Sequence, residues 1–164
     1  MFKFMKNNNK YSVLVVCMGN ICRSPTGEAV LRAKAQAKGL DDLHIDSAGT
    51  IGYHKGNPPD PRSKKAGEAR GYSFKGIKSR KLVEKDFETF DLLLAADHAN
   101  LADMLEMAPA EHKHKVKLFL EFGHSGHSEV PDPYYGGNKG FEVVLDLIEE
   151  ASEQILLQIE KEMA

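Results

Sequence analysis

Residues 11–25 read YSVLVVCMGNICRSP, and this stretch decides the fold class. Its first six residues form a short apolar run rich in β-branched side chains, which is typical of a strand buried on both faces. The pair Ser24-Pro25 is typical of a helix N-cap followed by proline at the first helical position. Between them lies a short loop that holds Cys17 and Cys22, the only cysteines of the chain. The stretch therefore predicts a strand, a reactive loop and a helix.

The rest of the chain alternates between strand-like and helix-like patterns. Further strands are expected at 44–48, 90–96 and 116–120. Apolar residues recur at helical spacing after the first loop and after Asp97, which is a predicted helix cap. An amphipathic stripe from 141 to 159 predicts a long C-terminal helix. Such alternation predicts a single α/β domain, a four-stranded parallel sheet with helices on both faces. The longest loops are expected at 52–62 and 123–137.

Charge and hydropathy exclude two kinds of partner. The chain carries 22 basic and 24 acidic side chains, mixed along its length without a long basic tract, so no nucleic acid is expected to bind. No apolar run is long enough for a membrane span, and residues 1–10 lack the apolar stretch of a secretory signal. We therefore expect a cytoplasmic protein with a polar N-terminal extension at 1–10 and one domain at 11–164.

The cysteines and histidines do not predict a metal site. The C-x4-C spacing of Cys17 and Cys22 is not that of a zinc knuckle or a thioredoxin site, and no second cysteine pair completes a metal cage. Four histidines lie among lysines, serines and glycines, which is typical of solvated loops: His112, His114, His124 and His127. A reactive thiol and no metal are the expectation.

The loop between the first strand and the first helix is a predicted anion site. Successive backbone N–H groups in such a turn converge on one point beside a helix N-terminus. The residues that would bind the anion in this way are Met18, Gly19, Asn20, Ile21 and Cys22. Gly19 and Asn20 are the residue types that most readily take left-handed backbone angles. Arg23 adds a planar guanidinium that matches two oxygens of a phosphate.

The same surroundings favour a nucleophilic Cys17. The N–H groups and the guanidinium favour its thiolate, and Ser24 is placed to donate its hydroxyl to the sulfur. Thiolate attack on a phosphate ester also requires a general acid for the leaving group. Asp132 is the best candidate, because it lies in a loop between Pro131 and Pro133 and precedes two tyrosines that can line a pocket.

Four motifs then occur in a fixed order. V-C-x-G-N-I-C-R-S-P at 16–25 is followed by S-A-G-T at 47–50, P-P-D-P-R at 58–62 and D-P-Y-Y-G at 132–136. Together they resemble the low-molecular-weight protein tyrosine phosphatases, and the resemblance runs from about Tyr11 through the final helix. It implies a four-stranded parallel sheet flanked by helices, and a two-step phosphoryl transfer that uses neither metal nor cofactor.

The resemblance also implies roles for the matching residues. Cys17 would become a phosphocysteine, with Ser24 assisting its thiolate, and Arg23 would bind the phosphoryl oxygens in both steps. Asp132 would protonate the leaving phenolate and later deprotonate the attacking water. Asn20 would hold the loop in shape.

Further roles follow by the same resemblance. Ser47 would lie behind Asn20, and Cys22 would trap oxidised Cys17 as a reversible disulfide. Ile77 replaces a histidine found in many members, so one supporting hydrogen bond to the loop is expected to be missing.

Substrate choice is expected to depend on the walls of the pocket. Tyr53, Tyr134 and Tyr135 would sandwich a phosphotyrosine ring. Related phosphoarginine phosphatases have threonine where this chain has Ile21, which favours phosphotyrosine. The expected partner is a phosphotyrosine-containing protein, with a bacterial tyrosine kinase favoured because the short loops resemble those of bacterial members.

Two other functions compete. An arsenate reductase of the same fold would need a third cysteine downstream, and none follows Cys22. A non-catalytic phosphotyrosine-binding module would be expected to lack Cys17 or Asp132, and this chain has both.

Overall fold

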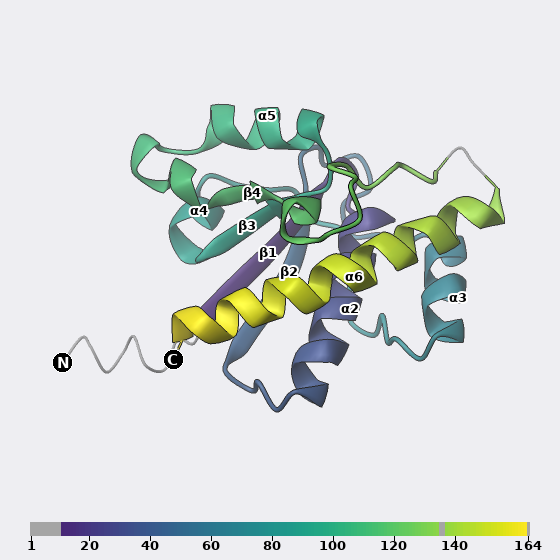
Figure 1. The fold of residues 1–164 in the computed structure, drawn as a ribbon. Coiled ribbons are helices and arrows are strands. Elements are labelled where there is room, and N and C mark those ends of the chain that lie inside the picture. The colour runs from purple at the N-terminus through teal and green to yellow at the C-terminus, as the bar shows by residue number, and fades with distance from the viewer. Residues whose placement is uncertain (1–10, 135–136, 164) are drawn as a thin grey trace.

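A four-stranded parallel sheet forms the centre of the protein (Figure 1). The structure, a computed structural model, describes residues 11–134 and 137–163, so the predicted extension at 1–10 and Tyr135 lie outside the described residues. The strands are β1 (Tyr11–Cys17), β2 (Leu43–Gly49), β3 (Leu92–Ala95) and β4 (Val116–Leu118), in the spatial order β2-β1-β3-β4. All neighbouring strands run parallel, which confirms the predicted fold class.

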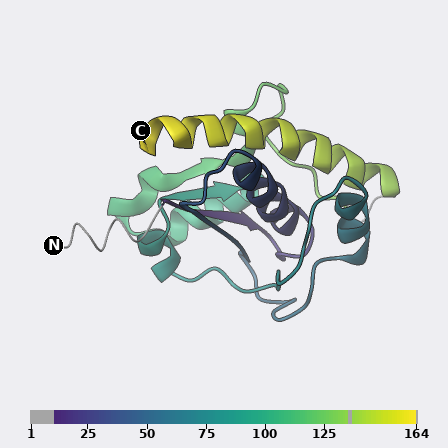
Figure 2. The same ribbon diagram turned by 90° about the horizontal axis from the view of Figure 1, so that it is seen from below.

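The helices cover both faces of the sheet (Figures 1 and 2). They are α2 (Arg23–Ala37), α3 (Pro61–Ala69), α4 (Lys85–Thr89), α5 (His98–Met107) and α6 (Asn138–Met163), with the 3₁₀ helices η1 (Ala110–Lys115) and η2 (Phe119–Phe122). Val13 and Val15 of β1 pack in one core with α2 and α6, whereas Leu14 and Val16 pack in a second core with α4 and α5. Because successive side chains of a strand point to opposite faces, the apolar run of β1 contributes to both cores.

Not every predicted boundary is right. The predicted strand at 116–120 ends at Leu118, because the chain turns there into η2. The predicted loop at 52–62 overlaps the start of α3, whose N-cap Asp60 accepts a hydrogen bond from the backbone N–H of Arg62. Asp60-Pro61 is thus an N-cap followed by proline in the first helical turn, the signal that a proline-rich loop concealed.

The predicted N-cap of the first helix is wrong. Helix α2 begins at Arg23, with Cys22 in the cap position and no side chain that caps it. The hydroxyl of Ser24 instead lies 3.1 Å from the sulfur of Cys17, so its hydrogen-bonding capacity is used inside the loop. Asp97, by contrast, caps α5 as expected from its position before that helix, and accepts a hydrogen bond from the N–H of Asn100.

The loop between β1 and α2 packs closely against the end of β2. Cys17, the last residue of β1, pairs with Gly49, the last residue of β2. A Cβ atom on Gly49 would lie 2.7 Å from the carbonyl oxygen of Met18 and 3.1 Å from the backbone nitrogen of Asn20. The loop can therefore take this path only over a glycine. None of the described helices is long and apolar enough to cross a membrane.

We predict that Gly49→Ala destabilises the protein by about 2 kcal/mol, because the added methyl group overpacks against backbone that cannot move aside. Urea unfolding followed by circular dichroism measures the change. Gly137→Ala is the matched control, since no atom lies within 4 Å of its added Cβ. Equal stability of the two variants would contradict the close approach at Gly49.

Candidate active site

The carbonyl groups of the loop at 17–23 are hydrogen-bonded from outside the loop. Those of Cys17 and Met18 accept from the N–H groups of Thr50 and Ile51, at 2.9 and 3.0 Å. The next donors are the hydroxyl of Ser79, at 3.0 Å from the Gly19 oxygen, and the N–H of Asp60, at 2.8 Å from the Ile21 oxygen.

The opposite ends of these peptide groups face inward. The C=O and N–H of a trans peptide point in opposite directions. The N–H groups that follow the bonded carbonyls, those of Met18, Gly19, Asn20 and Cys22, are thereby turned toward the inside of the loop. Within the described residues they have no hydrogen-bond acceptor, and such a row of unpaired donors suits an oxyanion.

The two residues expected to be left-handed behave differently. Asn20 has φ of 57°, in the left-handed region, as expected. Gly19 is not among the residues with positive φ, so that expectation is wrong. A Cβ on Gly19 would instead lie 2.9 Å from Cδ2 of His54, so a side chain at this position would displace that ring.

Cys17 lies at the bottom of this loop, and its side chain is almost fully buried. Its sulfur accepts a hydrogen bond from the N–H of Ser24 at 3.4 Å and lies 3.1 Å from the Ser24 hydroxyl oxygen. That oxygen already accepts from the side-chain amide of Asn20 at 2.7 Å. The Ser24 hydroxyl can therefore donate its hydrogen to the sulfur at 3.1 Å or to the carbonyl of Ala48 at 3.4 Å, and the sulfur is the nearer acceptor.

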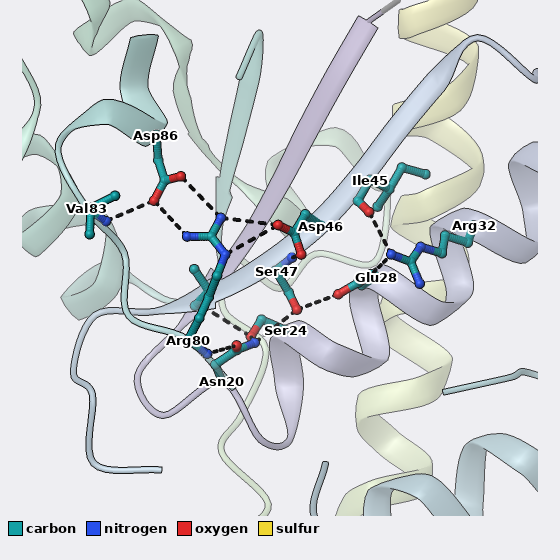
Figure 3. Close-up of polar contacts among 11 residues, drawn as sticks. Asn20, Ser24, Glu28, Arg32, Ile45, Asp46, Ser47, Arg80, Val83 and Asp86 are labelled. Atoms are coloured by element: carbon teal, nitrogen blue, oxygen red, sulfur yellow. Dashed lines mark hydrogen bonds and ion pairs between the residues drawn. The ribbon is translucent and has the colours of Figure 1, made fainter. Parts of the chain in front are cut away.

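Behind the loop, a row of buried polar groups leads from Asn20 into the protein (Figure 3). The Asn20 amide also donates to the Ser47 hydroxyl at 3.0 Å, and Ser47 donates to Oε1 of Glu28 at 2.6 Å. Glu28 is 2% exposed and forms an ion pair with Arg32. Burial raises the pKa of Glu28, against the opposing effects of Ser47 and Arg32.

Arg80 supports the loop from the other side (Figure 3). Its backbone N–H donates to Oδ1 of Asn20 at 3.0 Å, and its guanidinium lies between Asp46 and Asp86. Ile77 is buried in a small apolar cluster, and its side chain has no group that can hydrogen-bond the loop. Because Arg80 and Ser79 bond the loop directly, the loop is supported without a histidine at position 77.

Arg23 is anchored by one arm of its guanidinium. Nη1 donates to Oδ2 of Asp97 at 2.7 Å and to the carbonyl of Val130 at 3.1 Å. Asp97 lies just beyond the end of β3, beside the end of β1. Sequence reasoning identified Asp97 only as a helix cap, although a carboxylate after the neighbouring parallel strand is a signal for a place at this edge.

The loop of Asp132 does reach the cysteine loop. Oδ2 of Asp132 lies 3.7 Å from Nη2 of Arg23, and Oδ1 accepts from the N–H of Tyr134 at 3.0 Å. The carboxylate is about one-third exposed, so water and a ligand can reach it. Cys17, Arg23 and Asp132, far apart in the sequence, therefore line one cavity.

The second cysteine is also part of this cavity. Cys22 is buried, and burial raises the pKa of its thiol to about 12. At neutral pH it is therefore protonated. Both cysteines are free thiols in the structure.

The cavity has a volume of about 330 Å³. Besides residues of the cysteine loop, its lining consists of Ile51, Tyr53, His54, Asp132 and Tyr134. Tyr53 and Tyr134 thus lie where they were expected, although Tyr53 is 82% exposed and belongs to the mouth. His54, which sequence reasoning missed, packs edge-on against Tyr53 and lies 6.4 Å from the Tyr134 ring.

Arg62 explains why the P-P-D-P-R motif accompanies this pocket. Its guanidinium pairs with Asp60, lies over the rings of Tyr134 and Phe141, and donates to the carbonyl of Tyr134 at 3.0 Å. Arg62 therefore fixes the Tyr134 wall, another role that sequence reasoning missed. In residues 11–134 and 137–163, no three histidine, cysteine or acidic side chains gather as a metal site would require.

Comparisons with known proteins agree on one family. The model of the low molecular weight phosphotyrosine protein phosphatases matches residues 12–164. The low molecular weight protein-tyrosine-phosphatase YfkJ of Bacillus subtilis is 42% identical over 153 residues, covering 92% of this chain and 97% of that protein. The low molecular weight phosphotyrosine protein phosphatase of Schizosaccharomyces pombe is 45% identical over 132 residues, covering 79% of this chain and 84% of that protein. A crystal structure of a protein tyrosine phosphatase from Entamoeba histolytica, with Hepes in its active site, superposes with a TM-score of 0.90 at 41% identity, covering 94% and 99%.

We predict that the stability contributed by Glu28 depends on pH. Because its pKa is raised in the folded protein, the folded state binds more protons than the unfolded state above the ordinary value of about 4.3. The free energy of unfolding of wild type relative to Glu28→Gln should therefore fall as pH rises above that value. Urea unfolding at a series of pH values measures this difference.

Glu153→Gln is the control, because its effect on the free energy of unfolding should depend on pH in the opposite direction. A hydrogen bond from Lys34 lowers the pKa of Glu153, so its contribution is present above the ordinary value and is lost as pH falls. Parallel pH curves for wild type and Glu28→Gln would contradict the raised pKa.

Proposed function

Because the chain belongs to the low molecular weight phosphotyrosine protein phosphatase family, we propose that this protein-tyrosine phosphatase works through a cysteinyl-phosphate intermediate. One observation carries the proposal. The Cys17 sulfur, the Arg23 guanidinium and the Asp132 carboxylate line one cavity whose loop presents unpaired N–H groups. A thiol, an anion cradle and an acid are the three parts that the reaction needs.

In the proposed complex, the phosphoryl group lies in the loop with its oxygens on the inward N–H groups. Nη1 of Arg23 is held by Asp97 and Val130. Its Nε and Nη2 have no hydrogen-bond acceptor among the described residues, and these two donors match two phosphoryl oxygens. Fixing one arm of the guanidinium holds the other donors in place before substrate binds.

The first step forms a sulfur–phosphorus bond and breaks the phosphorus–oxygen bond to the tyrosine. Cys17 attacks as the thiolate, and Asp132 gives its proton to the departing phenolate oxygen. The second step reverses the role of Asp132. Its carboxylate takes a proton from the water that attacks phosphocysteine, phosphate is released, and the Ser24 hydroxyl bonds the departing thiolate.

The walls support phosphotyrosine as the substrate. Tyr53, His54 and Tyr134 place aromatic rings around the entrance, where they can contact a phenyl ring whose phosphate reaches the loop. Substrates are proposed to be phosphotyrosine-containing proteins of the cytoplasm. A bacterial tyrosine kinase is the proposed partner, as the short loops suggest.

Cys22 is proposed to protect the nucleophile. When peroxide oxidises the Cys17 thiolate to sulfenic acid, the Cys22 sulfur can displace water and form a disulfide, which a thiol reductant reverses. The position of Cys22 in the same cavity supports this pairing. Its raised pKa keeps Cys22 protonated, so Cys17 is the thiol that reacts first.

We predict that Cys17→Ser abolishes hydrolysis of p-nitrophenyl phosphate measured with a chelator and a reductant present. Asp132→Ala should lower kcat by about 100-fold or more, because the leaving group is no longer protonated. The loss should be larger for phenyl phosphate, which has the poorer leaving group. Asp41→Ala, at an exposed site near the opposite end of the sheet, is the control. Full activity of Cys17→Ser, or equal losses for both esters in Asp132→Ala, would refute these assignments.

We predict that Cys22→Ser makes peroxide inactivation less reversible. Wild type treated with peroxide should regain most of its activity with dithiothreitol, whereas Cys22→Ser should lose activity permanently as Cys17 is oxidised further. Mass spectrometry of the treated proteins measures disulfide against sulfinic and sulfonic acid. Equal recovery in both proteins would show that Cys22 does not trap oxidised Cys17.

A further inference from the structure

The segment from Ile51 to Lys85 is strongly basic in an otherwise acidic protein. It contains 10 basic and 3 acidic residues, whereas the whole chain has 22 and 24. Its arginines are all used in ion pairs: Arg62 with Asp60, Arg70 with acidic residues of α6, and Arg80 with Asp46 and Asp86. None of its seven lysines has an ion-pair partner among the described residues. The lysines are therefore the charges available to a ligand.

Two parts of this segment lie side by side next to the cavity. The N–H of Gly56 donates to the carbonyl of Ser79, and the N–H of Ser79 donates to the carbonyl of Asn57, both at 2.8 Å. A Cβ on Gly52 would lie 3.6 Å from the side chain of Lys81. The stretches 52–57 and 78–81 therefore form one surface.

This surface is continuous with the active site. Tyr53 and His54 line the cavity, and Lys55 follows them directly. The hydroxyl of Ser79, which follows Lys78, donates a hydrogen bond to the Gly19 carbonyl in the loop at 17–23. We call the exposed side chains of Lys55, Lys78 and Lys81 the basic rim.

The other side of the cavity carries the opposite charge. Asp132 lines it, Asp97 lies behind Arg23, and the exposed Glu129 precedes the Asp132 loop. Asp97 and Asp132 both face the guanidinium of Arg23, so Glu129 is the carboxylate on this side that has no ion-pair partner among the described residues. The unpaired lysines lie on the other side of the entrance.

We propose that the basic rim binds acidic residues that flank the phosphotyrosine of the substrate. The inference rests on the function proposed above and specifies its substrate class as phosphotyrosine in an acidic segment. When the phosphotyrosine ring lies between the aromatic walls, the neighbouring residues of the substrate pass over the mouth of the cavity. Those on the side of residues 52–57 then come within reach of long, mobile ammonium groups, where opposite charges attract and like charges repel.

The test compares two phosphotyrosine peptides that differ only in their flanks, one with glutamates on both sides and one with lysines. Wild type should have a kcat/KM about 10-fold higher for the glutamate peptide at about 50 mM NaCl, and the ratio should approach one at about 500 mM, because salt screens exposed charges.

Lys78→Glu is the decisive variant. It should lower the ratio about 5-fold, in part by raising kcat/KM for the lysine peptide, and a folding defect cannot produce such a gain. Lys161→Glu is the matched control, because Lys161 is exposed, has no ion pair among the described residues, and adjoins Glu162, which bonds Tyr11 at the opposite end of the sheet. This variant should keep the wild-type ratio.

The outcomes separate the two proposals. Two results would contradict the proposed role of the basic rim and leave the proposed function intact. In the first, wild type hydrolyses p-nitrophenyl phosphate but has the same kcat/KM for both peptides. In the second, Lys78→Glu and wild type have the same ratio of kcat/KM values for the two peptides. Failure of wild type to hydrolyse p-nitrophenyl phosphate and both peptides would overturn the proposed function, and this inference with it.

Discussion

The hydrogen bonds that hold the carbonyl groups of the loop at 17–23 outward are the interactions on which the site depends. Their donors come from the residues after β2, from the approach to α3 and from the segment before α4. Three parts of the chain, distant in sequence, therefore set the path of one short loop. Because the peptide groups are fixed in this orientation, the inward N–H groups are already placed for the oxyanion that we propose they bind, and its binding would need little reorganisation.

The buried polar groups behind the loop fix which atoms donate and which accept in the row of hydrogen bonds from Glu28 to Ser24. With Arg32 as its ion-pair partner, the Glu28 carboxylate accepts from Ser47. Ser47 then accepts from Asn20, and the second amide hydrogen of Asn20 goes to Ser24. Burying a carboxylate costs stability that such contacts only partly return. The row benefits the site because the Asn20 amide donates to the Ser24 oxygen, and the hydroxyl hydrogen can then point to the sulfur of Cys17 or to the carbonyl of Ala48.

The parts of this architecture that depend on local sequence could be predicted. The buried first strand, the anion loop and the amphipathic last helix follow from residue patterns alone, and so does the gathering of groups at one sheet edge. The start of α3 at Pro61 was missed because prolines also mark loops. The cap assigned to Ser24, and the roles of His54 and Arg62, could not be deduced correctly, because each depends on a partner brought near only by the fold.

The side chain of Asp97 connects the sheet to the proposed chemistry, because it bonds both a helix that follows a strand and the arginine of the site. Its Oδ1 caps α5 through the N–H of Asn100, and its Oδ2 holds Nη1 of Arg23, each at 2.7 Å. Since β1 and β3 are parallel neighbours, the residues that follow them emerge at the same edge. A cap is held in one rotamer by its helix, so the arginine bonded to it is held as well. The guanidinium that we propose binds phosphate is thus positioned by the sheet, and the ordering entropy is already lost on folding rather than on substrate binding.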